Sequence, residues 1–213
     1  MSLPRFVLAS ASPARLKLLR AVGIEPEVIV SAVDEEGLAA SSGWETPHDI
    51  SQGLAIAKAR AVAAALEGTA LVIGCDSVME FDGVAYGKPA NEAEAWERLR
   101  AMSGGFGNLF TGHHLIWLQA GERREASALV RTEVHFHEIT DAEIEAYIAS
   151  GEPLRVAGSY TLDALGGPFL REIRGDSTNV VGLSVPTLRL LLGELGLGWE
   201  HVLRAATTAD RSK

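Results

Sequence analysis

The chain has 213 residues, of which 47% are hydrophobic and 22% are charged, so it is long enough to bury a core without disulfides. Its formal net charge of -9 opposes a broad interface with a nucleic acid polymer, although a few local cations would still hold a small anion. A single cysteine cannot form an internal disulfide, which favours a reducing, cytoplasmic location. Residues 1–11 hold only a short apolar run, so we expect neither a signal peptide nor a membrane span.

Hydrophobic periodicity and capping residues predict alternating strands and helices. In order, we expect a strand at 6–9, a helix at 13–22, a strand at 28–30, a helix at 47–66, a strand at 71–74, a hairpin of 78–81 with 84–86, a helix at 92–102, strands at 109–118 and 128–136, a helix at 141–150, a strand at 169–173 and a closing helix at 185–195. The expected N-caps are Ser12, Thr46, Asn91 and Thr140. The dipeptide Asp82-Gly83 predicts a tight hairpin turn.

Helices mixed with hairpins indicate an α/β or α+β architecture with a mixed sheet. The sequence has no internal repeat and no linker long enough to force a domain boundary, so we expect residues 1–200 to form a single domain. Between 30 and 46 we expect an acidic run followed by a polar stretch without regular structure. Residues 201–213 are expected to form a flexible C-terminal tail.

Arg15 is the first residue that suggests a binding site. It lies in the first turn of the first predicted helix, where the positive end of the helix dipole disfavours a cation by a few tenths of a kcal/mol, so we expect an anion nearby. Ser10, Ser12 and the free backbone N–H groups of that turn would complete a phosphate cradle. The alternative is an ordinary Ser-Pro helix start with a solvated arginine.

Asp76 is the second candidate. It directly follows the apolar run at 71–74, so we expect it just past the carboxyl end of a buried strand, where open α/β sheets bind ligands. There it would hold Mg²⁺ or orient a water molecule. The alternative is an aspartate that only caps the following turn. The neighbouring Cys75 is interpreted as a small core residue rather than a nucleophile.

Lys88 is the third candidate. It stands between a glycine and a proline directly after the hairpin, where it can present a point charge to a phosphate, although a Gly-Lys-Pro sequence is otherwise only a turn.

The pairs His113-His114 and His135-x-His137 would bring imidazoles together on strands, but no third Cys or His follows at a fitting interval, so we do not expect a zinc site.

The candidate residues belong to a longer series of short motifs. In chain order these are Ala9-Ser10-Ala11-Ser12-Pro13-Ala14-Arg15, Val33-Asp34-Glu35, Lys58-Ala59-Arg60-Ala61, Gly74-Cys75-Asp76-Ser77-Val78, Gly87-Lys88-Pro89, Ser103-Gly104, Thr111-Gly112, Gly151-Glu152-Pro153, Ala157-Gly158-Ser159-Tyr160, Gly175-Asp176 and Asn179-Val180-Val181-Gly182-Leu183. In this order and at these intervals they closely resemble the motifs of the Maf family of nucleoside triphosphate pyrophosphatases, over residues 5–196.

The resemblance implies an elongated α/β fold with a central mixed sheet, two lobes and a cleft between them, similar to that of inosine-triphosphate pyrophosphatases. It also implies a nucleoside triphosphate substrate, cleavage to a monophosphate and pyrophosphate, a divalent cation (Mg²⁺ or Mn²⁺) and a homodimer. By position, Asp76 matches the catalytic acid and Glu35 its partner in holding the metal ion. Arg15, Lys58 and Lys88 match the contacts of the polyphosphate.

The chain departs from the family pattern at two positions. The family often has two arginines after Ser-Pro, but here Ala14 replaces the first, so only Arg15 is carried over. At the position of Asp163, one branch, selective for thymidine and uridine triphosphates, has glutamine, and another, associated with 7-methyl-GTP, has glutamate. A carboxylate only accepts hydrogen bonds, which suits the N–H donors of guanine or the amino group of cytosine. We therefore expect Asp163 to contact the base, and the chain to be closer to the 7-methyl-GTP branch.

Other functions remain open from the sequence. Maf-like proteins are also associated with septum formation and division arrest, so a non-catalytic regulator that acts by binding a partner or a nucleotide is the main alternative. A phosphatase that cleaves the γ-phosphate and a nucleotide-binding sensor are two more. Their products distinguish them from a pyrophosphatase.

Overall fold

A computed structural model of the chain describes residues 4–210. Within this range the strands form one seven-stranded sheet in the order β2-β1-β3-β5-β6-β7, and β4 pairs with β3 outside this path. The strands are β1 (Arg5–Leu8), β2 (Glu27–Val28), β3 (Ala70–Phe81), β4 (Val84–Tyr86), β5 (Phe106–Gln119), β6 (Glu122–Phe136) and β7 (Leu170–Arg174). Because β1 is parallel to β2 and β3 while the other pairs are antiparallel, the predicted mixed sheet is confirmed.

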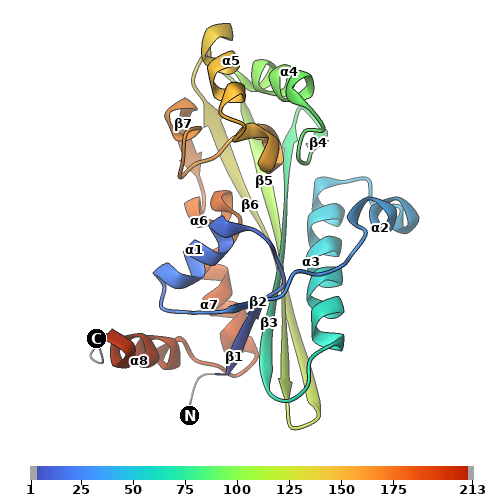
Figure 1. Cartoon of the computed structure of the whole chain (residues 1–213), viewed down its shortest axis with the longest axis vertical. Coiled ribbons are helices and arrows are strands. Elements are labelled where there is room, and N and C mark those ends of the chain that lie inside the picture. The colour runs from blue at the N-terminus through green and yellow to red at the C-terminus, as the bar shows by residue number, and fades with distance from the viewer. Residues whose placement is uncertain (1–3, 211–213) are drawn as a thin grey trace.

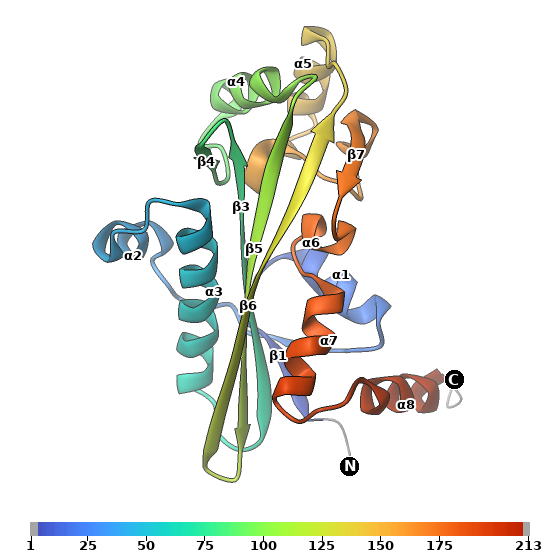
Figure 2. The ribbon, with the colours of Figure 1, turned by 180° about the vertical axis from the view of Figure 1, so that it is seen from behind.

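Helices flank the sheet along its length and the molecule is elongated, as predicted (Figure 1). They are α1 (Pro13–Ala21), α2 (Glu35–Ser42), α3 (Pro47–Ala64), α4 (Glu92–Met102), α5 (Asp141–Ala149), α6 (Ser177–Val181), α7 (Val185–Glu194) and α8 (Trp199–Asp210), with short 3₁₀ helices η1 (Pro153–Arg155), η2 (Ala157–Ser159) and η3 (Gly167–Phe169) between α5 and β7. In Figures 1 and 2, α3 lies beside the lower half of the long strands, α1, α6 and α7 lie on the opposite side, and α4 and α5 lie at the upper end.

The predicted turn and cap residues have the predicted roles. Each expected N-cap side chain accepts a hydrogen bond from the backbone N–H at the third helical position, which is the geometry of Ser12, Thr46, Asn91 and Thr140. In the hairpin between β3 and β4, Asp82 and Gly83 have φ angles of 50° and 78°, the positive values that a tight two-residue turn requires. These boundaries follow from local chemistry, which explains why the sequence predicted them.

The third strand differs from the prediction, and the difference concerns Asp76. Instead of ending at Gly74, β3 continues without interruption to Phe81, so Asp76 lies inside the strand rather than past its end. The reason is the antiparallel partner β5, which pairs with β3 from Ala70 to Glu80 and keeps the ladder intact.

Two further segments are helical where we expected irregular chain. Asp34 accepts the backbone N–H of Gly37 and begins α2, whose first turn is acidic and therefore favourable to the helix dipole. Of the predicted flexible tail at 201–213, residues 201–210 belong to α8, and 211–213 lie outside the described residues. The apolar residues of α8 recur at helical spacing, and Val202 is completely buried in the core, so burial stabilises a helix there.

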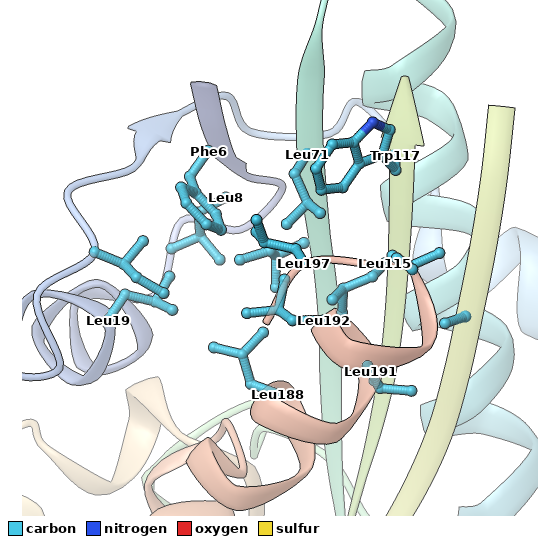
Figure 3. Packing of buried hydrophobic residues seen from close by; sticks show 14 of the residues in the cluster. Phe6, Leu8, Leu19, Leu71, Leu115, Trp117, Leu188, Leu191, Leu192 and Leu197 are labelled. Carbon is cyan, nitrogen blue, oxygen red and sulfur yellow. The ribbon is translucent and has the colours of Figure 1, made fainter. Parts of the chain in front are cut away.

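Buried apolar side chains form cores toward both ends of the sheet. The lower core joins β1, β3 and β5 to α1 and α7, and Figure 3 shows the leucines that fill it, among them Leu8, Leu19, Leu71, Leu115, Leu188 and Leu192. A second layer of this lower half packs α3 on the other face of the sheet. The upper core packs α4 and α5 on the sheet and includes Met79, Leu99, Phe136 and Ile144.

One strand connects the two cores. β3 contributes Leu71 and Ile73 to the lower core and Met79 and Phe81 to the upper one. The molecule therefore has two lobes that share a sheet. Among residues 4–210, none of the helices combines the length and the apolar character that crossing a membrane would require.

Candidate active site

The site lies where β1 stops pairing with β3. The ladder between them ends at Leu8 and Ile73, whereas β3 continues past Asp76. Close packing then brings α3 over this part of the sheet: a Cβ on Gly74 would lie 2.3 Å from the carbonyl oxygen of Ala55 in α3. Only glycine allows this approach, which brings the middle of α3 to Asp76.

Lys58 of α3 connects two carboxylates. Its Nζ donates to Oδ1 of Asp76 at 2.6 Å and lies 2.8 Å from Oε1 of Glu35, the first residue of α2. The side chains of Lys58 and Asp76 are 9% and 13% exposed, whereas that of Glu35 is 51% exposed. The ammonium pairs with both carboxylates and leaves the group with a net negative charge, and it brings together three residues that the sequence indicated separately.

Asp76 is unusually basic for an aspartate. Burial raises the pKa of Asp76 above its ordinary value, and the positive charges of Lys58 and Arg15 counteract that rise only in part. A carboxyl group with a raised pKa is a better proton acceptor than an exposed one when it is ionised. This property suits a residue that takes a proton from water.

Three hydrogen bonds hold the guanidinium of Arg15 in one orientation. Its Nε donates to the carbonyl of Gly182 at 2.7 Å, Nη1 donates to Oγ of Ser10 at 2.9 Å, and Nη2 donates to Oγ of Ser77 at 3.0 Å. The residue is 8% exposed. A guanidinium has five N–H groups, so one remains on each terminal nitrogen for a ligand. The buried, directed arginine contradicts the reading of a solvated arginine at an ordinary helix start.

The two predicted serines lie beside Arg15 in different roles. Ser10 is buried, and its Oγ accepts from Arg15 and from the backbone N–H of Ser12. Ser12 is the N-cap of α1 and accepts the backbone N–H of Arg15 at 3.4 Å. Both serines therefore shape the start of α1, where free N–H groups and the helix dipole favour an anion.

A chain of hydroxyl and amide groups lies behind Arg15. Ser77 bonds to Thr111 on β5 at 3.0 Å, and Thr111 donates to the carbonyl of Asn179 in α6 at 3.2 Å. The Asn179 amide donates in turn to Oγ1 of Thr132 on β6 at 3.1 Å. Ser77, Thr111 and Asn179 belong to motifs that the sequence indicated, but no role in the site was predicted for them. Because neighbouring residues of β3 face opposite sides of the strand, Asp76 binds Lys58 of α3 and Ser77 binds Arg15 of α1.

The remaining predicted residues lie on loops of the upper lobe. Lys88 is exposed between β4 and α4, and among residues 4–210 its side chain makes no ion pair or hydrogen bond. Asp163 lies between η2 and η3, and its carboxylate is 3.1 Å from Nζ of Lys17 on α1. The structure thus gathers Glu35, Lys58 and Asp76 directly but leaves Lys88 and Asp163 outside this contact network.

Cys75 and His113, two other residues considered from the sequence, are buried in the protein interior. Burial raises the pKa of the Cys75 thiol to about 11, and the residue is completely buried, which confirms it as a core residue rather than a nucleophile. His113 is also completely buried, and its Nε2 accepts the backbone N–H of Ser184 at 2.8 Å. Within the described chain, no group of three or more His, Cys, Asp or Glu side chains gathers as a metal site.

Two cavities lie outside this group of residues. A cavity of about 860 Å³ lies between α1, α7 and α8, and one of about 330 Å³ lies between α4 and α5. Neither is lined by a predicted site residue. The central cleft between the lobes stays a prediction.

Comparisons with a family model and with named proteins indicate the same family. The chain matches the model of the family described as Maf-like protein over residues 5–195. It is 55% identical over 195 residues to a protein of Streptomyces avermitilis named nucleoside triphosphate pyrophosphatase, covering 91% of this chain and 92% of that protein. A protein of the same name from Leifsonia xyli subsp. xyli is 48% identical over 210 residues, covering 95% of this chain and 98% of its own length.

One solved structure is related more distantly. A crystal structure of a nucleoside-triphosphatase, or dITP/XTP pyrophosphatase, from Mycobacterium abscessus matches 63% of this chain and 75% of its own, with 13% identity and a TM-score of 0.36. A similarity this low supports no inference about function.

Proposed function

The chain belongs to the Maf-like protein family, and we propose that it hydrolyses nucleoside triphosphates to nucleoside monophosphates and pyrophosphate. The observation that carries the proposal is the buried carboxylate of Asp76, bonded to Lys58 and followed in β3 by Ser77, which binds the fixed guanidinium of Arg15. A base beside two cations is what hydrolysis of a polyphosphate requires, because catalysis there depends mainly on positioning and charge stabilisation.

Each residue has a role in this proposal. A triphosphate carries about four negative charges, which Arg15, Lys58 and Lys88 neutralise in part. Ser10, Ser12 and the start of α1 surround one phosphate group with donors and the positive end of the helix dipole. Asp76 orients a water molecule toward the α-phosphorus and accepts its proton, and pyrophosphate leaves toward Lys58 and Lys88.

We also propose a divalent cation, Mg²⁺ or Mn²⁺, held by Asp76 and Glu35. Their carboxylates already share one cation, the Nζ of Lys58, at 2.6 and 2.8 Å, so a metal ion would take the place that this ammonium holds without substrate. Oxygen ligands suit both ions, and Mg²⁺ is commonly held by one or two carboxylates together with substrate phosphates. When bound, the cation would neutralise charge on the phosphoryl oxygens.

The proposed contact to the base is Asp163, which favours a guanine-like or cytosine-like substrate because a carboxylate only accepts hydrogen bonds. Its ion pair with Lys17 adds a donor at the same place. A homodimer and a cytoplasmic location stay predictions.

Product analysis tests the proposal. The protein is incubated with ATP, GTP, CTP, UTP, dTTP and 7-methyl-GTP and with MgCl₂, and nucleotides, pyrophosphate and orthophosphate are quantified by ion-exchange chromatography. We expect a monophosphate and pyrophosphate in equal amounts. EDTA should stop the reaction, and added Mg²⁺ or Mn²⁺ should restore it.

The other outcomes identify the alternatives. A diphosphate and orthophosphate would indicate cleavage of the γ-phosphate. Binding without any product, measured by calorimetry, would indicate a sensor. Neither binding nor product would favour a regulator that acts through a protein partner.

A further inference from the structure

The loop that carries Lys88 is fastened to α4 at both of its ends. Before Lys88, the carbonyl of Gly87 accepts a hydrogen bond from Nη1 of Arg98 at 2.8 Å. After it, the backbone N–H of Ala90 donates to Oε2 of Glu94 at 2.6 Å. Glu94 and Arg98 are also bonded to each other, one helical turn apart. Two paired side chains of α4 therefore bind the backbone on both sides of Lys88.

Arg98 is itself held in place. Its side chain is only 12% exposed, and its guanidinium carbon lies 4.9 Å from the ring centre of Tyr86, the last residue of β4. The Gly87 carbonyl also accepts the backbone N–H of Gly158 at 3.2 Å, so the same turn is attached to η2. Because the Arg98 side chain is mostly buried, its hydrogen bond should fix the turn more firmly than an exposed surface ion pair, which contributes little to stability.

The turn needs this support because its sequence does not stiffen it fully. Pro89 fixes one backbone angle after Lys88, but a Cβ at Gly87 would meet nothing within 4 Å, so no packing limits that residue. The lysine side chain is long and exposed, and holding it for a ligand costs conformational entropy. A loop that is already fixed lowers that cost.

We propose that Arg98 and Glu94 are positioning residues that hold the Gly87–Ala90 turn so that Lys88 meets the polyphosphate. The inference rests on the proposed function, in which Lys88 contacts the substrate, and adds residues that touch no substrate themselves. Arg98 binds the carbonyl of Gly87, before Lys88. Glu94 binds the N–H of Ala90, after Lys88, and also pairs with Arg98.

A double-mutant cycle tests whether Arg98 acts through Lys88. Affinity for a triphosphate with a non-hydrolysable α,β-methylene bridge is measured by calorimetry for Arg98→Ala, Lys88→Ala and the double variant, and KM and kcat are measured with the hydrolysed substrate. We expect Arg98→Ala to weaken binding and raise KM by about tenfold, with kcat changed less than twofold, since a charged hydrogen bond of this kind commonly accounts for such a factor. On the Lys88→Ala background, Arg98→Ala should add less than twofold, because the two act in one unit.

Matched variants separate positioning from general stability. Arg100→Ala removes an arginine from the same helix, but Arg100 pairs with Asp141 rather than with the turn, so binding should stay as in the original chain. Glu94→Ala should weaken binding as Arg98→Ala does, and amide hydrogen exchange at Ala90 should be at least about tenfold faster in Glu94→Ala, since its N–H loses its acceptor there.

Two results would overturn the inference. Additive effects of Arg98→Ala and Lys88→Ala would mean that Arg98 acts elsewhere, and unchanged exchange at Ala90 would mean that the turn does not depend on the pair. Failure of the proposed function looks different: the analogue binds and the cycle still shows coupling, but no triphosphate is hydrolysed.

Discussion

Arg15 and Gly182 are 167 positions apart in the chain, yet the Nε–H of Arg15 donates to the carbonyl of Gly182 at 2.7 Å. A Cβ on Gly182 would lie 3.2 Å from the same nitrogen. The contact attaches α1 to the turn between α6 and α7 and fixes the direction of the guanidinium. Arg15 thus depends on the last third of the chain for its orientation.

Replacing Arg15 by lysine should therefore impair substrate binding more than the retained charge suggests. Lysine cannot satisfy Gly182, Ser10 and Ser77 at once in the planar arrangement of a guanidinium. We expect kcat/KM for a triphosphate to fall by about ten- to a hundredfold. Arg20→Lys, an exposed arginine of the same helix, is the control. Equal activity of both variants would show that the fixed geometry has no role.

Asp76→Asn should abolish turnover and preserve the fold. The amide keeps the shape of the side chain but accepts no proton, and loss of a general base commonly lowers kcat by about 10²–10⁴-fold. Lys58 keeps Glu35 as a partner at 2.8 Å, so the circular dichroism spectrum should stay unchanged. Asp82→Asn is the matched control, because Asp82 lies in the exposed hairpin turn and asparagine tolerates its positive φ of 50°. Undiminished pyrophosphate release by Asp76→Asn would refute the catalytic role.

His113 makes the stability of the fold depend on pH. Burial, together with the nearby charge of Arg15, lowers the pKa of His113 from 6.5 to about 4 in the folded chain. Between these values the unfolded chain binds a proton that the folded chain does not, so stability falls as pH drops from about 6.5 to about 4. At roughly 1.4 kcal/mol per pKa unit, the loss amounts to roughly 3 kcal/mol.

Urea unfolding at several pH values measures this effect. His113→Gln removes the titrating group and keeps an acceptor for the backbone N–H of Ser184. The variant should lose less stability than the original chain over the same pH range, whatever its stability at neutral pH. If the two curves run parallel, His113 is not the group responsible.

Asp163, rather than its ion pair with Lys17, should determine the choice of base. Because Lys17 occupies the Asp163 carboxylate at 3.1 Å, Asp163→Gln and Lys17→Ala change the same contact in different ways. Asp163→Gln should lower kcat/KM for GTP relative to UTP by about tenfold, as one lost charged hydrogen bond implies. Lys17→Ala removes the partner of the Asp163 carboxylate and should leave the order of substrates unchanged. A panel dominated by dTTP in the original chain would exclude Asp163 as the residue that reads the base.

The features that could be predicted from the sequence are those that residues close together in the chain determine, namely helix starts and tight turns. Ser12 and Thr140 sit at helix starts because their side chains bond to N–H groups three positions away, and Asp82-Gly83 turns because its own dihedral angles allow it. Long-range pairing was not predictable in this way. Only the ladder between β3 and β5 shows that Asp76 lies within a strand. Likewise, no local pattern shows that Lys58 bonds to both Glu35 and Asp76, although each was recognised as a candidate.

The helices α2 and α8, which were not predicted, differ in their sequence signals. α2 contains serine and glycine, which favour turns, and only the Asp34 cap and its acidic first turn indicate a helix. Helix α8 depends on burial, since Val202 gains its stabilisation from residues distant in sequence. Propensity alone could not have found α2, whereas the helical spacing of apolar residues did indicate α8.

The shared strands restrict how the molecule can move. In many enzymes, substrate enters when two domains rotate about a flexible linker. Here Leu71 and Met79, in different cores, belong to one strand whose hydrogen bonds to β5 continue between them, so a rotation of that kind would have to break backbone pairing. Motions that admit a nucleotide are therefore expected in a segment that leaves the sheet, such as 152–169, rather than in the sheet itself.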